Sequence, residues 1–370
     1  MSAQAAEAGR AVEVADKLRL LRAALAQAGA GAIRLRGLDW LAWATAGADA
    51  GLSLAADCGV AELLVTADEA CVLTDAIDAE RLRAEQLPDG FSFHIAPWAD
   101  TELHETYVLG AAGGAVVLSD RPRADEAALP SALRLRRMVL GEAERQRYRA
   151  LGQEAAAAVG EALRAARPGW TEYELAAAAA RALLARGIQP ALLLAAGERR
   201  LPLYPHPLPT HERLGGRALL ACCARRHGLY ANLTRCRSFG PLPDALRGAQ
   251  QELLQAEATG LDAVRPGQSL SAVYHALDAA YRHANRPEAI LEQRQGGITG
   301  YAAREIETGP STATGLEPGM AFAFHPGFAG LRIEDTFLLG PGGLENLTPD
   351  PLWPAANVNG RARPLWLEEE

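Results

Sequence analysis

Several patterns that mark particular protein classes are missing from this chain of 370 residues. Its five cysteines are odd in number and show no CxxC spacing, which argues against a disulfide framework and a zinc knuckle. No segment has the roughly 18 uninterrupted apolar residues of a membrane span. The alanine-rich N-terminus carries Glu7, Glu13 and Asp16 and lacks the apolar core of a secretion signal. We therefore expect a cytoplasmic protein without a membrane partner.

A basic stripe interleaved with aromatic residues is also missing. The net charge is −8 and the isoelectric point is about 5.6, so we expect no nucleic-acid partner. The arginine-rich segment 134–149 is interrupted by Glu142 and Glu144, as is typical of a solvated helix face. Hydrophobic residues at 49% and charged residues at 22% are ordinary for a globular protein, and the length predicts two domains.

The first part of the chain alternates between helical and extended patterns. Apolar residues recur at helical spacing over about residues 12–28 and stop at Gly29. A second amphipathic helix is expected over 76–87. Strands are predicted around residues 32–35, 62–66, 70–75, 91–98 and 114–120, the second and third forming a hairpin. This alternation predicts an α/β domain over residues 1–137.

The second part contains one arrangement twice. A long helical pattern over 141–166 is followed by Arg-Pro-Gly and a helix that opens with Thr171 and Glu174, the spacing of a capping box. A helical pattern over 244–264 is again followed by Arg-Pro-Gly and a helix that begins at Ser269. The repeat, about 100 residues apart, predicts an internal duplication in a domain over residues 138–370.

Glycines are densest between Gln295 and Asp335, where two glycine-rich loops lead into short apolar runs. Glycine lets a backbone approach a ligand or another strand closely, so a ligand site and tight hairpin turns are both consistent with this stretch. The segment ends in Arg332-Ile333-Glu334-Asp335 after apolar strands. Charged side chains at the end of a buried strand need partners, which favours a site.

Motifs along the chain resemble those of the creatinase, aminopeptidase P and prolidase group, the M24 or pita-bread family. The resemblance covers nearly the whole chain and rests on ARPGWTEYEL, YPHPLPT, HGLYANLTR, GGITGY, HPG and RIED. It implies a creatinase-like α/β N-terminal domain and a pita-bread C-terminal domain. The latter is an α+β fold whose two halves of helices and antiparallel sheet enclose the site, commonly in a homodimer.

The resemblance departs at the metal site. Active members of the family hold two metal ions with Asp, Asp, His, Glu and Glu. The corresponding positions here are Ala221, Asn232, Gly297, His325 and Glu334, so a single carboxylate remains. One carboxylate cannot neutralise and bridge two divalent ions, and we predict no metal and no other cofactor. A single-metal site from His206, His227, His325 and Glu334 is an alternative that their spacing does not support.

Other positions retain polar groups. His206 matches a family histidine that serves as general acid/base in creatinase, a metal-free member, although a histidine between prolines also suits a structural turn. Arg304 stands where the family has a second substrate histidine and would bind a carboxylate through its planar fork. We expect His206 and Glu334 to be catalytic. The residues expected to bind substrate are Arg304, Tyr301, His325, Arg235 and Asn232.

Two features leave other interpretations open. Arg235 and Asp335 are as consistent with a structural ion pair as with a role at the site. Cys222 and Cys223 occupy the strand that has lost a metal ligand, and at most one of these neighbours faces the cavity. A nucleophilic cysteine paired with His206 is the minor alternative, because buried thiols are usually inert.

The sequence thus favours a metal-independent enzyme that hydrolyses a C–N bond in a small, amino-acid-like compound with a carboxylate. A zwitterionic substrate would place its carboxylate at Arg304 and its cationic nitrogen at Glu334, with His206 beside the reacting bond. The first alternative is a non-catalytic binding or scaffold protein with the same fold. The second is a metal-dependent Xaa-Pro peptidase.

Overall fold

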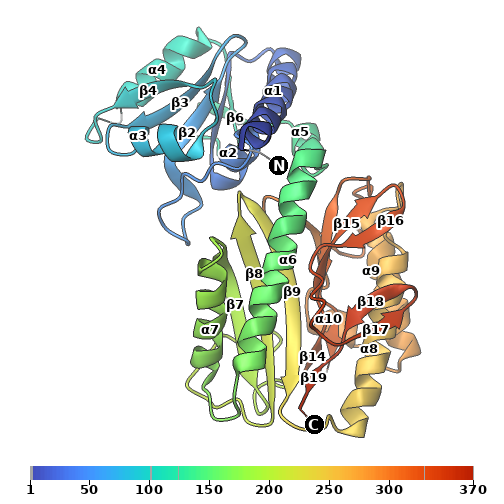
Figure 1. The fold of residues 1–370 in the computed structure, drawn as a ribbon. Helices are drawn as coiled ribbons and strands as arrows, with labels where there is room; N and C mark the ends of the chain where they lie inside the picture. Colours follow the sequence, from blue (N-terminus) through green and yellow to red (C-terminus); the bar gives the residue numbers. More distant parts are fainter. Residues whose placement is uncertain (1–2, 101, 124, 329, 370) are drawn as a thin grey trace. The chain divides into compact units, whose positions relative to one another are not determined.

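The computed structural model describes residues 3–100, 102–123, 125–328 and 330–369. They form two compact units (Figure 1). The first runs up to Glu144 and includes His227–Leu229, and the second consists of Arg145–Arg226 and the residues from Tyr230 on. In the described part of the chain, no helix combines the length and the apolar character needed to cross a lipid bilayer.

The first unit is an α/β domain built on a mixed sheet in the order β4-β3-β2-β1-β5-β6. β1, β2 and β3 pair antiparallel, and the other neighbours pair parallel. Its strands are β1 (Ala32–Gly37), β2 (Cys58–Val65), β3 (Ala70–Asp75), β4 (Ser92–Ala96), β5 (Val117–Ser119) and β6 (Glu126–Ala128). Its helices are α1 (Ala3–Ala28), α2 (Leu38–Ala44), α3 (Ala79–Arg81), α4 (Glu102–Ala112) and α5 (Ser131–Arg137).

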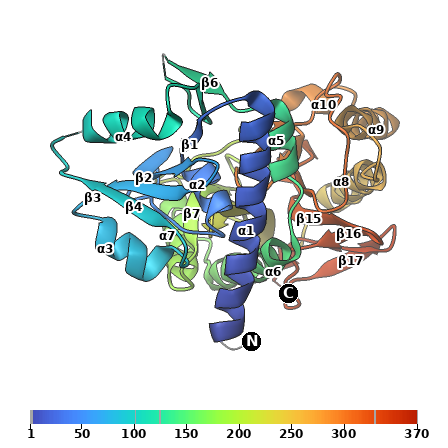
Figure 2. The same ribbon diagram turned by 90° about the horizontal axis from the view of Figure 1, so that it is seen from above.

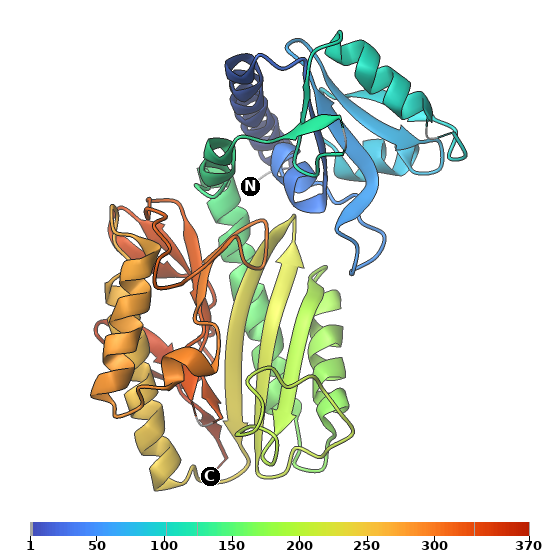
Figure 3. The same cartoon turned by 180° about the vertical axis from the view of Figure 1, so that it is seen from behind.

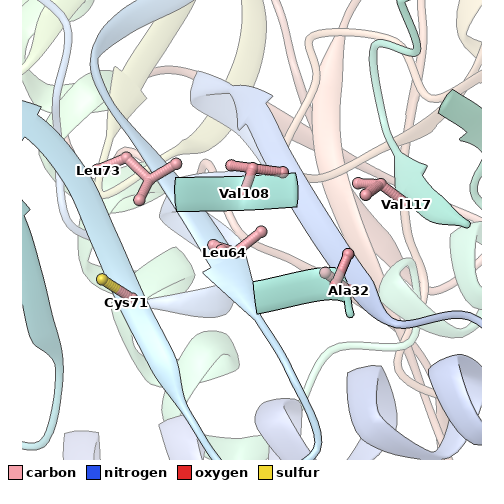
Figure 4. Packing of buried hydrophobic residues seen from close by; sticks show 7 residues of the cluster. Ala32, Leu64, Cys71, Leu73, Val108 and Val117 are labelled. Carbon is pink, nitrogen blue, oxygen red and sulfur yellow. The ribbon is translucent and has the colours of Figure 1, made fainter. Parts of the chain in front are cut away.

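The helix expected over 76–87 is shorter than predicted. α3 continues into a π-helical turn, η1 (Leu82–Gln86), which the amide of Leu87 closes by donating to the carbonyl of Leu82 at 2.9 Å. Figure 2 shows α4 and α3 on opposite faces of the sheet. A buried cluster joins the sheet to α4 (Figure 4) and consists of Ala32, Leu64, Cys71, Leu73, Val108, Ala112 and Val117.

The second unit has the predicted pita-bread arrangement of two halves. One half contains α6 (Glu142–Ala165), α7 (Glu172–Leu184) and a sheet in the order β19-β9-β8-β7. Its strands are β7 (Gln189–Gly197), β8 (Arg217–Arg226), β9 (Leu229–Ser238) and β19 (Leu367–Glu368).

The other half contains α8 (Asp244–Asp262), α9 (Leu270–His283), α10 (Ala289–Glu292) and a sheet in the order β11-β10-β12-β15-β16. Its strands are β10 (Gly296–Thr299), β11 (Ile306–Glu307), β12 (Ala321–Phe324), β15 (Asp335–Gly340) and β16 (Gly343–Asn346). Two small hairpins complete it: β13 (Gly327–Phe328) with β14 (Leu331–Arg332), and β17 (Ala355–Val358) with β18 (Arg361–Pro364). Figure 3 shows α7 on one side and α8 and α9 on the other, with the sheets between them.

The duplication predicted from the Arg-Pro-Gly repeats is visible in the hydrogen bonds of the two halves. Thr171 caps α7 in a full capping box with Glu174, and the Ser269 side chain accepts from Ala272 N at the start of α9. Each cap residue also forms an isolated β-bridge to the loop that follows, Thr171 with Arg213 and Ser269 with Gly315. The two helix starts are therefore tied to their loops in the same way.

Candidate active site

The two sheets of the second unit meet at Glu334. Thr234 on β9 forms an isolated antiparallel bridge with Glu334, and the Thr234 amide donates to the Glu334 carbonyl at 3.0 Å. The Thr234 hydroxyl donates to Glu334 Oε2 at 2.9 Å, and Arg332 Nη2 donates to the same oxygen at 2.9 Å. Glu334 is buried, at 3% exposure. The cation next to this carboxylate is thus Arg332, which was not among the predicted site residues.

His206 and His325 face each other across the same region, with ring centroids 6.5 Å apart. His206 lies exposed in the loop between β7 and β8, whereas His325 follows β12 and is buried. Partial burial and the charge of Arg332 lower the pKa of His206. Burial, together with Arg332 and Arg304, holds the pKa of His325 well below its ordinary value. Both imidazoles are therefore neutral at pH 7, and each can accept a proton.

Arg304 lies half-buried between β10 and β11. Its Nη1 donates to the carbonyls of Ala323 at 2.6 Å and Gly297 at 3.3 Å, which fixes one arm of the guanidinium against the sheet. The remaining nitrogens of the fork can bind a carboxylate. The nearby Tyr301 is buried, with 1% of its surface exposed.

Asn232 is held in a network of hydroxyl groups. Its Nδ2 donates to Thr299 Oγ1 at 3.1 Å, and its backbone exchanges two bonds with Thr336 Oγ1 at 2.7 and 2.9 Å. The buried Asn232 Oδ1 has no hydrogen-bond partner among the described residues, and neither does His325 Nδ1. An unsatisfied buried acceptor costs about 1–3 kcal/mol, so both atoms are available to a ligand or a water molecule.

Arg235, which we expected to bind substrate, is engaged with the protein itself. Its Nη2 donates to Asp335 Oδ1 at 2.7 Å and to the Thr348 carbonyl at 2.8 Å. Arg363 Nη1 binds the other Asp335 oxygen at 2.7 Å and uses its remaining nitrogens on Glu257. All four charged side chains are at most 3% exposed. Arg235 thus belongs to a structural ion-pair network, one of the two interpretations left open by the sequence. The network holds Asp335, the residue that follows Glu334.

Sequence reasoning missed Arg363 and Glu257. They lie far along the chain from Asp335, in β18 and α8, and no spacing or motif pointed to them. Arg332 was visible in the RIED motif, and its position two residues before Glu334 was the available signal.

A pocket of about 80 Å³ is lined in part by Arg332. Its polar lining comes from Tyr204, Glu292, Gln293 and Arg332, and Arg332 Nη1 lies 3.5 Å from the carbonyl oxygen of Pro205, which also lines it. The rest is largely apolar and includes Leu201, Pro202, Leu219, Phe328 and Leu331. A small molecule with an apolar part fits such a lining.

Comparison with known proteins decides the family. The family model described as metallopeptidase family M24 matches residues 146–341, more than half of the chain. The chain belongs to metallopeptidase family M24.

Relatives within M24 are named as hydrolases and peptidases. An uncharacterized hydrolase/peptidase, y4tM, of Sinorhizobium fredii is 29% identical over 162 residues, 40% of each chain. An ectoine hydrolase of Halomonas elongata is 29% identical over 136 residues, 33% of each chain. This chain thus matches between a third and two fifths of the length of these relatives.

Two solved structures illustrate the fold. An Xaa-Pro dipeptidase from Bacillus anthracis aligns with a TM-score of 0.77 and 19% identity, covering 96% of this chain and all of that one. The N-terminal domain of the FACT complex subunit SPT16 from Cicer arietinum aligns with a TM-score of 0.70 and 13% identity, covering 91% and 96%.

The residues that the family resemblance assigns to the metal positions do not have the chemistry of a dinuclear centre. Ala221 and Gly297 carry no donor atoms, and Asn232 offers only a neutral amide. A Cβ at Gly297 would lie 2.1 Å from the Ile306 carbonyl oxygen, so the backbone leaves no room there for a histidine. No group of three or more His, Cys, Asp or Glu side chains suited to a metal ion occurs in the described ranges. His227 groups with the first unit, whereas the other members of the alternative single-metal set lie in the second.

Cys223, rather than Cys222, is the partly exposed member of the cysteine pair. It shares a strand face with Ala221, since side chains alternate along β8. Burial and the Glu334 carboxylate raise the pKa of Cys223 to about 12, against the opposing charges of Arg304 and Arg332. The side chain is therefore a neutral thiol at pH 7, which disfavours the nucleophilic cysteine.

Proposed function

We propose that this M24 protein is a metal-independent hydrolase that breaks a C–N bond in a small, amino-acid-like compound bearing a carboxylate. The observation that carries the proposal is the environment of Glu334. The one carboxylate at the five metal positions is bound by Arg332 and Thr234, so its charge is already balanced within the chain. Its partner Arg332 lines the pocket, and the neutral His206 ring, which feels the charges of both residues, lies 6.5 Å from the His325 ring.

In this proposal His206 is the general acid/base. Its lowered pKa leaves it unprotonated at pH 7, ready to take a proton from a water molecule as the water oxygen bonds to the substrate carbon. The same proton is then given to the nitrogen as the C–N bond breaks. His206 is thus neutral again at the end of the cycle.

Arg304 would hold the substrate carboxylate with the part of its fork that is not bound to Ala323 and Gly297. Asn232 Oδ1 and His325 Nδ1 are acceptors for substrate N–H groups, because neither has a partner among the described residues. The cationic nitrogen that we expected at Glu334 would share that carboxylate with Arg332. We retain Glu334 as a catalytic residue that orients or stabilises the reacting group.

Names of relatives support hydrolysis of small molecules. The ectoine hydrolase is one such relative, and an agropine synthesis cyclase of Rhizobium rhizogenes, 28% identical over 209 residues, is another with a small-molecule reaction in its name. We also propose, from the family resemblance and the composition, a cytoplasmic homodimer.

Two alternatives have support of their own. A non-catalytic binding protein is favoured by the fold of the SPT16 domain, which is named as part of a complex. A metal-dependent Xaa-Pro peptidase is favoured by the name of one relative, the Xaa-Pro dipeptidase of Lactobacillus delbrueckii, 28% identical over 130 residues. The residues at the metal positions argue against this second alternative.

The test is a turnover assay of the purified protein with Xaa-Pro dipeptides and with creatine-like carboxylates, each with and without a chelator. Turnover of the second group that the chelator does not change supports the proposal. Chelator-sensitive cleavage of Xaa-Pro dipeptides would establish the peptidase instead. Binding without turnover, unchanged in His206→Ala, would establish the binding protein.

A further inference from the structure

The loop that carries His206 has few apolar anchors. It runs from Glu198 to Gly216, between β7 and β8, and has no helix or strand. Its buried side chains are Leu201, Pro207 and Leu214, while residues 202–206 are all exposed. Because so little apolar surface is buried in this segment, hydrogen bonds and ion pairs must hold it if His206 is to keep one position. We call these contacts tethers.

One buried carboxylate accepts four of the hydrogen bonds that hold the loop, beside backbone bonds such as that from Ala195 N to the Pro207 carbonyl at 3.1 Å. Glu172, the first residue of α7, has no exposed surface. Its Oε1 accepts from Gly197 N at 2.9 Å, and its Oε2 accepts from Thr210 N at 2.9 Å and from Thr210 Oγ1 at 2.7 Å. Arg200 Nη1 forms an ion pair with the same oxygen. Glu172 therefore joins the end of β7 at Gly197 to Thr210, on the far side of His206 in the loop. The N-terminal end of a helix favours its negative charge.

The tether continues toward His206 through Arg200. The Arg200 Nη1 that binds Glu172 also donates to the Leu208 carbonyl at 3.0 Å. The Arg200 guanidinium lies over the Tyr204 ring at 5.2 Å from its centroid. Tyr204 and Leu208 stand two residues before and two residues after His206. The two contacts hold both flanks of the histidine.

The duplicated half provides an internal comparison. Glu172 N donates to Glu212 O and Tyr173 N donates to Thr210 O, and in the other half Leu270 N donates to Thr314 O and Ser271 N to Thr312 O. Leu270, which follows its cap residue as Glu172 follows Thr171, is the counterpart of Glu172 and is fully buried. The repeated pattern of backbone hydrogen bonds therefore forms with an apolar residue at the position of Glu172. The carboxylate is present only in the half whose loop carries His206.

We infer that Glu172 is a positioning residue for His206: it acts through Thr210, Gly197 and Arg200 to hold the histidine loop against the pocket. The importance of this position for catalysis rests on the proposed function. The tether itself does not.

The test compares Glu172→Leu, which installs the residue of the other half, with Glu174→Ala on the same helix turn. Glu174 caps α7 through Thr171 and, among the described residues, donates or accepts no hydrogen bond to loop 198–216, so its loss controls for damage to the helix start. Amide hydrogen exchange of residues 198–216 in Glu172→Leu should quicken at least about tenfold. By NMR, the His206 pKa should rise toward about 6.5, the value of a free imidazole. Both readouts should stay at wild-type values in Glu174→Ala.

Glu172→Gln keeps an acceptor and should restore part of the exchange protection. If Glu172→Leu fails to fold, Arg200→Met removes only the loop side of the tether and should quicken exchange at 203–209. Unchanged loop exchange in both Glu172→Leu and Arg200→Met, or equal loosening in Glu174→Ala, would overturn the inference. These readouts need no substrate. A wild-type protein without turnover would count against the proposed function while leaving the tether measurable.

Discussion

Arg332 Nη2 lies 2.9 Å from Glu334 Oε2, and the two side chains are 10% and 4% exposed. A guanidinium thus stands beside the one carboxylate at the family's metal positions. In a partly desolvated site this pairing balances the charge that a divalent ion would otherwise balance. The predictions about the site start from this pair.

The first prediction concerns metal content. Purified protein should contain well under one Mn, Co, Zn or Fe per chain, because Ala221, Asn232 and Gly297 offer no anionic or imidazole donor. EDTA should leave the thermal unfolding midpoint unchanged, since no folding free energy depends on a bound ion. Plasma mass spectrometry and melting curves with and without EDTA measure both. Two tightly held ions per chain, after loading with excess Mn²⁺ and desalting, would contradict the prediction.

The second prediction separates binding from turnover. Arg304→Ala should weaken binding of the carboxylate substrate by about 1.5–3 kcal/mol, because charge-assisted hydrogen bonds are lost. His206→Ala should abolish turnover and leave the dissociation constant nearly unchanged. Calorimetry and steady-state kinetics check the two effects. Arg304→Lys, which keeps the charge without the fork, should give an intermediate affinity. Equal affinity of wild type and Arg304→Ala would remove Arg304 from the site.

The third prediction concerns stability and pH. Burial alone would raise the pKa of Asp335, but Arg235 and Arg363 outweigh it and hold that pKa below its ordinary value. A lowered pKa in the folded state means that the ionised carboxylate stabilises the fold. Its contribution is complete above the unfolded-state pKa of about 3.9 and is lost as the pH falls through the folded-state value.

Asp335→Asn should therefore cost about 3 kcal/mol or more in unfolding free energy at pH 7, since it leaves the buried Arg235 without a carboxylate and Arg363 with Glu257 alone. The difference from wild type should stay constant from pH 7 to pH 5 and shrink below about pH 3.9. Urea unfolding at each pH measures it. Glu345→Gln, which breaks the exposed pair with Arg149, is the control and should change stability by less than about 1 kcal/mol. Equal effects of the two variants would show that the buried network contributes little.

The fourth prediction tests the cysteines. Cys58 is exposed, Cys223 is partly buried, and burial raises the pKa of Cys223 to about 12. A thiol reagent at pH 8 should modify Cys58 in the native protein and leave Cys71, Cys222, Cys223 and Cys236 unmodified. Cys58→Ser should then show no fast-reacting thiol, while urea should expose the remaining ones. Fast modification of native Cys223 at pH 7 would instead support the alternative in which a cysteine paired with His206 is the nucleophile.

The fifth prediction is the oligomeric state. From the family resemblance we expect a homodimer, with a mass about twice the 39.2 kDa of one chain. Light scattering at working concentration measures the mass. A value near that of one chain would refute the dimer.

Local sequence determined the helix starts and the duplication. The capping box of Thr171 and Glu174, the Ser269 cap and the two Arg-Pro-Gly segments act over three or four residues, so their spacing along the chain is enough to predict them. The same holds for the loss of metal donors, because side-chain chemistry at five positions does not depend on packing.

Tertiary structure alone decided the partners of the buried charges. Arg363 binds Asp335 from 28 residues away and Glu257 from 106, and Glu172 binds Thr210 from 38. No periodicity links such positions, since the partner of a buried charge is whichever group the packed sheets and helices bring within hydrogen-bond distance. For the same reason the sequence did not predict that the rings of His206 and His325 lie 6.5 Å apart. Nor did it decide that Arg235 binds Asp335 within the buried ion-pair network. The sequence thus proposed candidate residues for the site, while the packing of the two halves decided which of them bind one another.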